Sequence, residues 1–438
     1  MNSIISKTPE MTIIGNVSNT LIRVIEYASR ICYDATDKMT ETSWEKYISA
    51  RVKSHHESVI EHGVFSFVID LTGGDYGYET KSIYGITNGE TMIHCVEETL
   101  ANSNSLIHYV KESGWNPRSE SRSILILSGN MKMWRDLMKY ALSMGYAKDH
   151  MVCGAIIHRL ISMVRIFDYH CKGIFTIDMP EFHSDNIEVF MESMLPLPFK
   201  NTGVSDALNS YEDRNYYFRY RFQKDWDSVP IIKTENCDLV YRQKYDELLE
   251  DGGDPGICMR ILNIDNFSNA AIGGSGFDTP MYLKHFIAYH TKDLNSVSYV
   301  IRMPRIVTQQ EARHRINSIS QRSQRYVDEV SKDCEFYCPP AIDPTKKYGD
   351  YTYEEFMDLT KVMYKNLRDA GVKKEDARNV LPGGIYSTMV VTKPLYTLPH
   401  YFHERCDNAA QAEIRLPAIA LRDYLNNYFV RKSNGPLF

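Results

Sequence analysis

A basic segment at residues 310–326 holds the side chains best suited to chemistry on an anion. It concentrates four arginines, a histidine and several hydroxyl groups in a chain whose formal net charge is −6. Arginine presents a planar fork of donors that matches phosphate oxygens, and it keeps its charge. Arg315, Arg322 and Arg325 have the spacing of one helical face, with Arg313 directed elsewhere, so we expect a helix that serves two anions. The alternative is a solvent-exposed helix face that carries the same residues without binding an anion.

The order of these residues narrows the interpretation. Arg313, His314 and Arg315 are followed, after seven residues, by Ser323, which begins a Ser-x-Arg-Tyr continuation. This pattern resembles the Arg-His-Arg-x7-Ser signature of flavin-dependent thymidylate synthases. Its order and spacing make it more specific than a lone glycine-rich loop.

Four further segments resemble other elements of the same family. Residues 376–382 resemble its Ala-Arg-x-x-Leu-Pro element, and residues 404–415 resemble its Leu-Arg-x4-Ala-Gln-x-Glu-Ile segment. Early in the chain, residues 28–33 resemble Ala-Arg-x-Ser-Tyr, and residues 56–62 resemble His-x-[Ser/Thr]-Pro-Phe-Glu-His. The family motifs therefore bracket nearly the whole chain.

The resemblance implies reductive methylation of dUMP to dTMP. FAD would carry the redox step, reduced by NADPH, with 5,10-methylenetetrahydrofolate as the carbon donor. The Pro-Cys-His nucleophile segment of the ordinary folate-dependent thymidylate synthases is absent from this sequence. Protein groups would then position the rings and offset negative charge.

The site residues are carried over from the matching motifs. The catalytic set would be Arg313, Ser323 and Arg405. The flavin-binding set would be His56, Ser58, Glu61, Asn130, Arg313, His314 and Arg315, and the nucleotide-binding set Gln310, Gln321, Ser323, Arg325, Arg378 and Arg405. Ser323 has no paired base within sequence reach, so we interpret it as a hydrogen-bond donor and not a nucleophile. No metal is expected, because residues 56–62 match neither zinc-protease spacing.

Short internal matches indicate a duplication. Phe65–Ile69 matches Val297–Ile301, and Ser123–Ser128 matches Ser387–Thr392. The alternative is coincidence between two α+β segments separated by a large insertion.

We expect an α+β fold made of two related copies of the synthase fold, each a central, mostly antiparallel sheet flanked by helices. The N-terminal, degenerate copy would occupy residues 1–175 and the C-terminal copy residues 229–438, with residues 176–228 as a connector. The length of 438 residues also exceeds what one core usually serves.

Periodicity predicts the individual elements. We expect strands at 11–14, 64–69, 124–127 and 298–301, and helices at 18–31, 44–54, 91–110, 131–142 and from Thr308 onward.

Composition limits the class of protein. A pI near 6.2 argues against a general nucleic-acid or membrane-surface binder. The sequence contains no membrane-length apolar run, and its first residues lack the pattern of a signal peptide, so we expect neither a membrane span nor secretion. Nine scattered cysteines suggest reduced thiols and a cytoplasmic location, and the lone pair Cys334 and Cys338 lacks the second pair of a zinc site.

Two features leave alternatives open. Family members usually carry glutamate where this chain has Gln321, so a dCMP methylase or hydroxymethylase is a second hypothesis. An inactive nucleotide- or nucleic-acid-binding homologue would keep the same arginines. If duplication is real, each copy retains what the other lost, and we expect two chains to form a homo-oligomeric pseudo-tetramer whose sites draw on both halves. The partners would be dUMP or dCMP and folate, with no membrane.

Overall fold

The structure is a computed structural model whose described residues form two compact units. It describes residues 10–14, 19–40, 42–70, 108–114, 123–133, 238–242, 258–264, 291–330, 334–339, 341–431 and 437–438. Unit 1 comprises Met1–Ile25, Thr40–Ile231 and Asp265–Asn295, and unit 2 comprises Glu26–Met39, Ile232–Ile264 and Ser296–Phe438. Among the described helices, none has the length and apolar character needed to cross a membrane.

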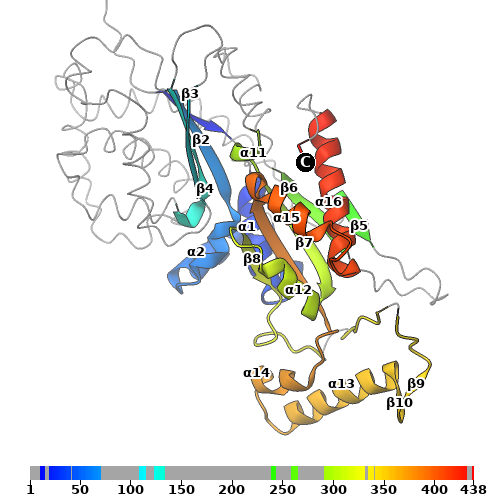
Figure 1. Ribbon diagram of the computed structural model, residues 1–438. Helices are drawn as coiled ribbons and strands as arrows, with labels where there is room; N and C mark the ends of the chain where they lie inside the picture. Colours follow the sequence, from blue (N-terminus) through cyan, green and yellow to red (C-terminus); the bar gives the residue numbers. More distant parts are fainter. Residues whose placement is uncertain are drawn as a thin grey trace, which may run out of the picture. The chain divides into compact units, whose positions relative to one another are not determined.

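Unit 1 is built on a four-stranded antiparallel sheet (Figure 1). Its strands are β1 (Glu10–Ile14), β2 (Val64–Asp70), β3 (His108–Gly114) and β4 (Ser123–Asn130), in the order β1-β2-β4-β3. Its described helices include α2 (Ser43–Lys53), the 3₁₀ turn η2 (Glu57–His62) and α11 (Thr291–Leu294). Helix α1 (Asn19–Ile31) runs from unit 1 into unit 2, where the 3₁₀ turn η1 (Thr36–Lys38) follows it.

Unit 2 contains a five-stranded antiparallel sheet. Its strands are β5 (Asp238–Arg242), β6 (Cys258–Ile264), β7 (Ser296–Pro304), β11 (Tyr386–Pro394) and β8 (Ser318–Gln321), in that spatial order. Helices α12 (Arg305–Ala312), α15 (Leu398–Arg405) and α16 (Ala412–Arg431), with the 3₁₀ turn η7 (Leu395–Thr397), accompany it. Apolar side chains of β7 and β11 pack against those of α15 and α16 to form the core. Burial of this surface is the main stabilising term.

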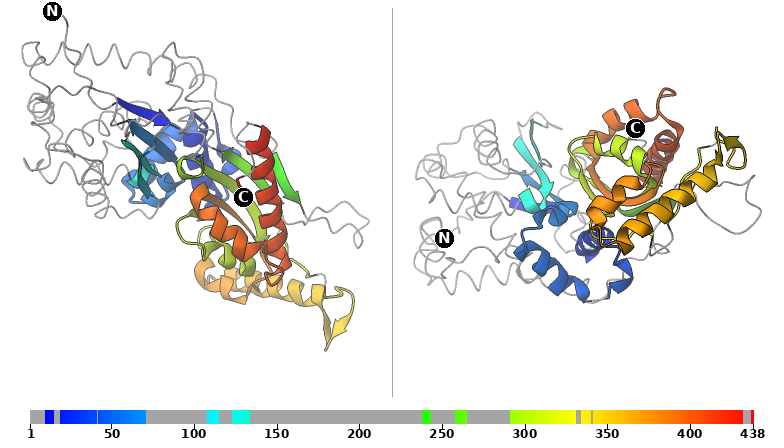
Figure 2. Two further views of the ribbon diagram at one scale, coloured as in Figure 1. Left: turned by 45° about the horizontal axis from the view of Figure 1, so that its top comes forward. Right: turned by 90° about the horizontal axis from the view of Figure 1, so that it is seen from below.

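A helical arm extends from the sheet of unit 2 (Figures 1 and 2). It consists of the hairpin β9 (Lys347–Tyr348) and β10 (Tyr351–Thr352), then α13 (Tyr353–Asp369), α14 (Lys374–Ala377) and the 3₁₀ turn η6 (Arg378–Val380). Thr352 and Glu355 form a capping box at the start of α13, which satisfies two backbone donors there. Gly371, with φ of 85°, follows the end of the same helix.

The two sheets share strand order and register at the segments that match in sequence. Ser66 pairs with Ser128 across β2 and β4, and Ser298 pairs with Thr392 across β7 and β11. The strand pair β2–β4 is flanked by β1 and β3, and the strand pair β7–β11 is flanked in the same way by β6 and β8. All four flanking strands run antiparallel to the strand beside them.

Most predicted elements are confirmed. The expected strands correspond to β1, β2, β4 and β7, and the expected helices at 18–31 and 44–54 to α1 and α2. The helix predicted at 131–142 begins as expected at 131–133, and its remainder lies outside the described residues. The proposed connector at 176–228 also lies outside them.

Two helix predictions are wrong. The helix expected at 91–110 does not extend to its predicted end, because residues 108–110 belong to β3 and pair with β4. Residues 91–107 lie outside the described residues. The arginine-rich helix ends at Ala312, and Ile316 takes a positive φ of 61° before β8 begins. Ser318 and Ser320 are buried while Ile319 and Gln321 are half-buried, so pairing with β11 replaces the helix.

Candidate functional site

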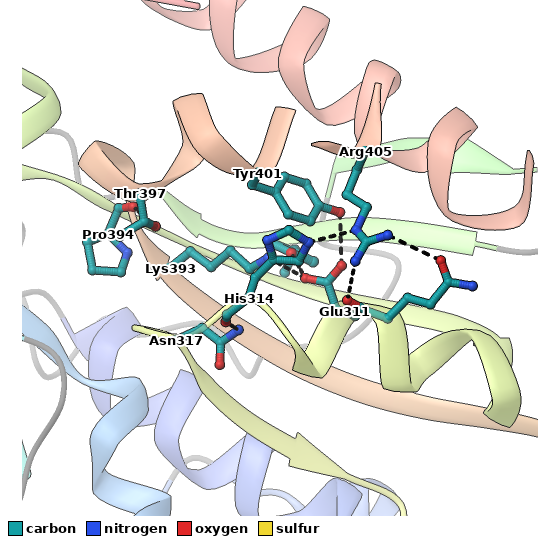
Figure 3. Close-up of polar contacts among 10 residues, drawn as sticks. Glu311, His314, Asn317, Lys393, Pro394, Thr397, Tyr401 and Arg405 are labelled. Carbon is teal, nitrogen blue, oxygen red and sulfur yellow. Dashed lines mark hydrogen bonds and ion pairs between the residues drawn. The ribbon is translucent and has the colours of Figure 1, made fainter. Parts of the chain in front are cut away.

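An ion pair lies buried beneath the basic segment in unit 2 (Figure 3). Lys393 Nζ lies 2.5 Å from Glu311 Oε1, and the two side chains are 1% and 0% exposed. The hydroxyls of Tyr299 and Tyr401 donate to the same carboxylate at 2.7 and 2.9 Å. Lys393 Nζ also lies 3.6 Å from the centroid of the Tyr401 ring. The carboxylate therefore accepts from three donors, as its ionised form requires.

The pKa values of this pair follow from its surroundings. Burial alone would raise the pKa of Glu311, but the charge of Lys393 and the three hydrogen bonds hold it below its usual value. Burial lowers the pKa of Lys393, and Glu311 opposes that shift. Burial raises the pKa values of both tyrosines well above their usual range, with Glu311 acting in the same direction. The pair thus holds one positive and one negative charge side by side, and the two act on the pKa of His314 in opposite directions.

His314 and Arg405 come together next to this pair (Figure 3), and Gln310 also accepts hydrogen bonds from Arg405. Arg405 Nε donates to His314 Nε2 at 2.7 Å, so this nitrogen carries a lone pair and the imidazole is neutral. Burial, followed by the charge of Lys393, lowers the pKa of His314 to about 4. Arg405 also donates to the side chain and the backbone carbonyl of Gln310, at 3.3 and 3.2 Å. Three predicted site residues from α12, its C-terminal loop and α15 therefore meet at one point.

Arg313 and Arg315 flank this point and are both exposed. Between them and β8 the chain turns sharply at Ile316, and the Asn317 side-chain amide donates to the backbone carbonyl of His314. The loop, and not a helix, thus fixes the direction of the two arginines. Their guanidinium groups are accessible for an anion.

A second group of predicted residues gathers where the segment meets the arm. The Ser323 backbone N–H donates to the Cys32 carbonyl, and Ser323 Oγ accepts from the Arg325 N–H, both at 3.2 Å. Arg325 Nε lies 3.4 Å from the Glu375 carboxylate, and Arg378 Nε donates to the Glu375 carbonyl at 3.1 Å. Glu375 therefore links Arg325 and Arg378, which lie far apart in sequence.

Arg305 and Arg322 belong to this second group, and the motifs did not identify either as a site residue. Arg322 pairs with Glu329 at 3.2 Å and with Asp34 at 3.6 Å. Arg305 Nη1 and Arg322 Nε are buried without a hydrogen-bond partner in the part of the chain that the structure describes. Burial lowers the pKa of Arg305, with Glu329 and Arg378 acting on it in opposite directions. An unpaired buried guanidinium nitrogen is costly, so it suits an anionic ligand.

The placement of Arg322 also corrects the predicted helical face. Its side chain is 16% exposed, whereas that of Arg325 is 56% exposed. The sequence supplied no signal for Arg305, which lies upstream of the motif, at the start of α12.

Gln321 is held by two hydroxyl groups. Its Nε2 donates to Thr308 Oγ1 and to Ser387 Oγ, each at 2.9 Å. Both hydrogens of the amide are therefore taken up by the protein, and its oxygen remains as an acceptor.

The predicted flavin-binding residues of the N-terminal half lie in unit 1. His56 and Ser58 are exposed on or next to η2, and Glu61 pairs with Lys132 at 3.5 Å. The side chain of Asn130 accepts from the Met133 N–H at 2.8 Å and so caps the turn at 131–133. Because Val64 pairs with Asn130, the turn η2 and Asn130 lie at the same end of the β2–β4 pair. Among the described residues, no group of His, Cys, Asp and Glu could hold a metal ion.

Comparisons with known proteins agree on one family. Residues 281–429 match the family model described as "Thymidylate synthase complementing protein". A flavin-dependent thymidylate synthase of Geobacter sulfurreducens is 38% identical over 169 residues, which cover 38% of this chain and 71% of that protein. Those of Nitratidesulfovibrio vulgaris and Pyrococcus furiosus are 37% and 33% identical, over 30% and 32% of this chain. The matched part spans 56% and 59% of these two proteins, a little more than half of their length.

A solved structure of a UMP/dUMP methylase from Streptomyces cacaoi, bound with 5-Br dUMP, was also found. It is 22% identical, with a TM-score of 0.29, and covers 39% of this chain and 90% of that one. A likeness this distant does not bear on function.

Proposed function

The chain belongs to the flavin-dependent thymidylate synthase family, and from this membership we propose that it methylates dUMP to dTMP with a bound flavin. The observation that carries the proposal is the meeting of Gln310, His314 and Arg405, which come from family motifs 91 to 95 residues apart. A solvated helix face would not bring these side chains together. We therefore assign the group to binding and polarising the ligands of the reaction.

The arginines at the base of the arm would bind the nucleotide phosphate. Ser323, Arg325 and Arg378 are carried over from the family, and Arg305 and Arg322 add buried donors that lack a partner among the described residues. Guanidinium groups suit a phosphate dianion because several of their donors can engage its oxygens at once. A phosphate here would satisfy the donors that the protein leaves unpaired.

The residues around His314 fit the flavin. Arg313 and Arg315 are exposed cations that suit the pyrophosphate of FAD. By family resemblance, His56, Ser58, Glu61 and Asn130 are also expected to contact a flavin. When bound, FAD supplies the hydride chemistry that no side chain of the described residues can supply. His314, kept neutral chiefly by burial and accepting a hydrogen bond from Arg405 at Nε2, would offer a hydrogen bond without adding charge. NADPH and methylenetetrahydrofolate are the expected reductant and carbon donor.

The orientation of Gln321 favours uracil over cytosine. Because Thr308 and Ser387 occupy both hydrogens of the amide, only its acceptor oxygen remains for a base. Uracil offers an N–H donor at N3, whereas cytosine offers an acceptor there, so a protein acceptor that faces N3 suits dUMP. A dCMP methylase or hydroxymethylase is the alternative, since amide and carboxylate differ in charge at this position.

The shared strand order and register of the two sheets support an internal duplication. We propose copies at 1–175 and 229–438 joined by residues 176–228, with the N-terminal copy keeping the flavin-contacting residues and the C-terminal copy the basic motif. Two chains would then form a pseudo-tetramer. Each active site would draw on both kinds of copy.

Flavin binding tests the assignment. We expect the purified protein to bind FAD with a flavin absorbance spectrum, and Arg313→Ala with Arg315→Ala to weaken that binding at least 10-fold. Arg422→Ala, which removes an exposed arginine paired with Asp423 on α16, is the matched control and should leave binding unchanged. A protein that binds no FAD but binds RNA in a salt-sensitive manner would instead support the inactive nucleic-acid-binding homologue.

A further inference from the structure

Glu329 is a buried carboxylate in the segment that follows β8, and it belongs to none of the family motifs. The residue is 2% exposed, and its Oε2 atom lies 3.2 Å from Nη1 of Arg322. Among the described residues this buried oxygen has no hydrogen-bond partner, so its contact with Arg322 is an ion pair. Carboxylates are seldom buried unless a cation compensates them, so the basic groups beside Glu329 indicate its role.

Two arginines compensate this carboxylate. Burial raises the pKa of Glu329, and the charges of Arg322 and Arg305 oppose that shift. Asp34 and Asp328 act in the same direction as burial. Their side chains are 34% and 27% exposed, so water screens their charges. Glu329 is therefore the carboxylate that meets both arginines away from solvent.

The backbones of the two arginines are fixed to one stretch of chain. The Arg305 N–H donates to the Ile385 carbonyl at 2.8 Å, and the Arg322 N–H donates to the Thr388 carbonyl at 2.9 Å. These two carbonyls lie at or just before the start of β11. The arginine side chains therefore begin at neighbouring points. Each keeps a buried nitrogen without a partner among the described residues, Nη1 of Arg305 and Nε of Arg322.

A buried carboxylate can prepare such arginines for a ligand. A long side chain that is fixed only at its backbone loses rotamer freedom when a ligand orders it, and this loss weakens binding. A guanidinium group has five N–H donors, so one that already contacts a carboxylate keeps others for a second anion. We propose that Glu329 is a positioning residue that holds Arg305 and Arg322 in place for the phosphate of the nucleotide. This inference rests on the proposed function only in that a nucleotide phosphate binds at these arginines.

The direction of the effect separates positioning from simple electrostatics. A carboxylate repels a phosphate, so if Glu329 only added negative charge near the site, its neutralisation would strengthen phosphate binding. If Glu329 positions the arginines, its neutralisation releases them and weakens phosphate binding. Glu329→Gln keeps the size of the side chain and removes its charge, so this variant decides between the two.

Calorimetric titration of the full-length protein with dUMP and with deoxyuridine tests the proposal. We expect Glu329→Gln to weaken dUMP binding about 10-fold, the equivalent of one charged hydrogen bond. Binding of deoxyuridine, which lacks the phosphate, should not change. Asp423→Asn removes an exposed carboxylate that pairs with Arg422 on α16. This variant is the matched control and should bind both ligands like the wild type.

Two further variants test whether reach and partner matter. Glu329→Asp keeps the charge but shortens the side chain, so it should bind dUMP more weakly than the wild type and more tightly than Glu329→Gln. It carries the test if Glu329→Gln does not fold, as thermal unfolding will show. In an Arg322→Met background, Glu329→Gln should weaken dUMP binding less than it does in the wild type, because one of its two partners is gone.

Three outcomes would overturn the proposal. The first is dUMP binding by Glu329→Gln that is as tight as that of the wild type, or tighter. The second is an equal loss of affinity for dUMP and deoxyuridine, and the third is an undiminished effect in the Arg322→Met background. These titrations measure binding alone, so their result does not depend on whether bound dUMP is methylated. The mass of the nucleotide product reports separately on the proposed reaction.

Discussion

Lys393 on β11 and Glu311 on α12 form an ion pair that is shielded almost completely from solvent, next to His314 and Arg405. Desolvating two charges costs several kcal/mol, and their attraction with additional hydrogen bonds offsets that cost. The pair therefore does little for net stability, but each member depends on the other.

The first prediction concerns this dependence. Lys393→Met should destabilise the protein by about 3–5 kcal/mol, because it leaves the Glu311 carboxylate buried without its counter-charge. Adding Glu311→Leu should recover most of the loss, measured by urea unfolding. Arg422→Met removes the exposed pair with Asp423 and should cost less than about 1 kcal/mol. If the double variant is as unstable as the single one, the two charges are not coupled.

The second prediction concerns acid. The pKa of His314 is lowered to about 4 and that of the buried His62 to about 3, in each case chiefly by burial. The unfolded chain, with histidine pKa values near ~6.5, therefore binds more protons than the folded one below that pH. Stability should be independent of these groups above ~6.5 and should fall as the pH drops through the window down to about 4.

Thermal unfolding between pH 7 and 4 checks this window. His314→Gln, whose amide oxygen can still accept from Arg405, should show a shallower decline than the wild type. His403→Gln, at an exposed position, is the control and should follow the wild-type curve. Equal slopes in all three proteins would show that His314 is not held neutral by the fold.

The third prediction concerns the fork of Arg405. Arg405→Lys keeps the charge but cannot contact His314 and both acceptors of Gln310 together. We expect kcat/KM for the nucleotide to fall about 10- to 100-fold, the equivalent of one or two charged hydrogen bonds. Arg422→Lys should leave kcat/KM unchanged. Full activity of Arg405→Lys would mean that only the positive charge at this position matters and that the three guanidinium contacts do not.

The fourth prediction concerns base selection. Thr308→Val with Ser387→Ala frees the Gln321 amide to turn its N–H groups toward the base. We expect the ratio of kcat/KM for dCMP over dUMP to rise about 10-fold, because one or two hydrogen bonds change partner. Adding Gln321→Glu should restore the preference for dUMP, since a carboxylate can only accept. An unchanged ratio would mean that Gln321 does not contact the base.

The sequence could predict the residues of the site better than their arrangement. Motif spacing identified Gln310, His314 and Arg405, and strand periodicity located β2, β4 and β7. The prediction that Arg315, Arg322 and Arg325 lie on one helical face is wrong, because backbone pairing of β8 with β11 outweighs the local periodicity.

The buried ion pair could not have been anticipated from either segment alone. Glu311 and Lys393 lie on different elements, and each looks like an ordinary polar residue of its own element. Only the packing of α12 over β11 brings them together. Arg305 could not be identified from its own segment either. Its Nη1 is buried without a hydrogen-bond partner among the described residues, and Glu329 and Arg378 act on its pKa.

The mass of the nucleotide product is the most direct test of the central claim. The protein would be incubated with dUMP or dCMP together with FAD, NADPH and methylenetetrahydrofolate, and the nucleotides weighed. The account predicts that dUMP gains one CH₂ group and becomes dTMP, while dCMP is recovered unchanged. Recovery of unaltered dUMP from flavin-loaded protein, or methylation or hydroxymethylation of dCMP, would contradict it.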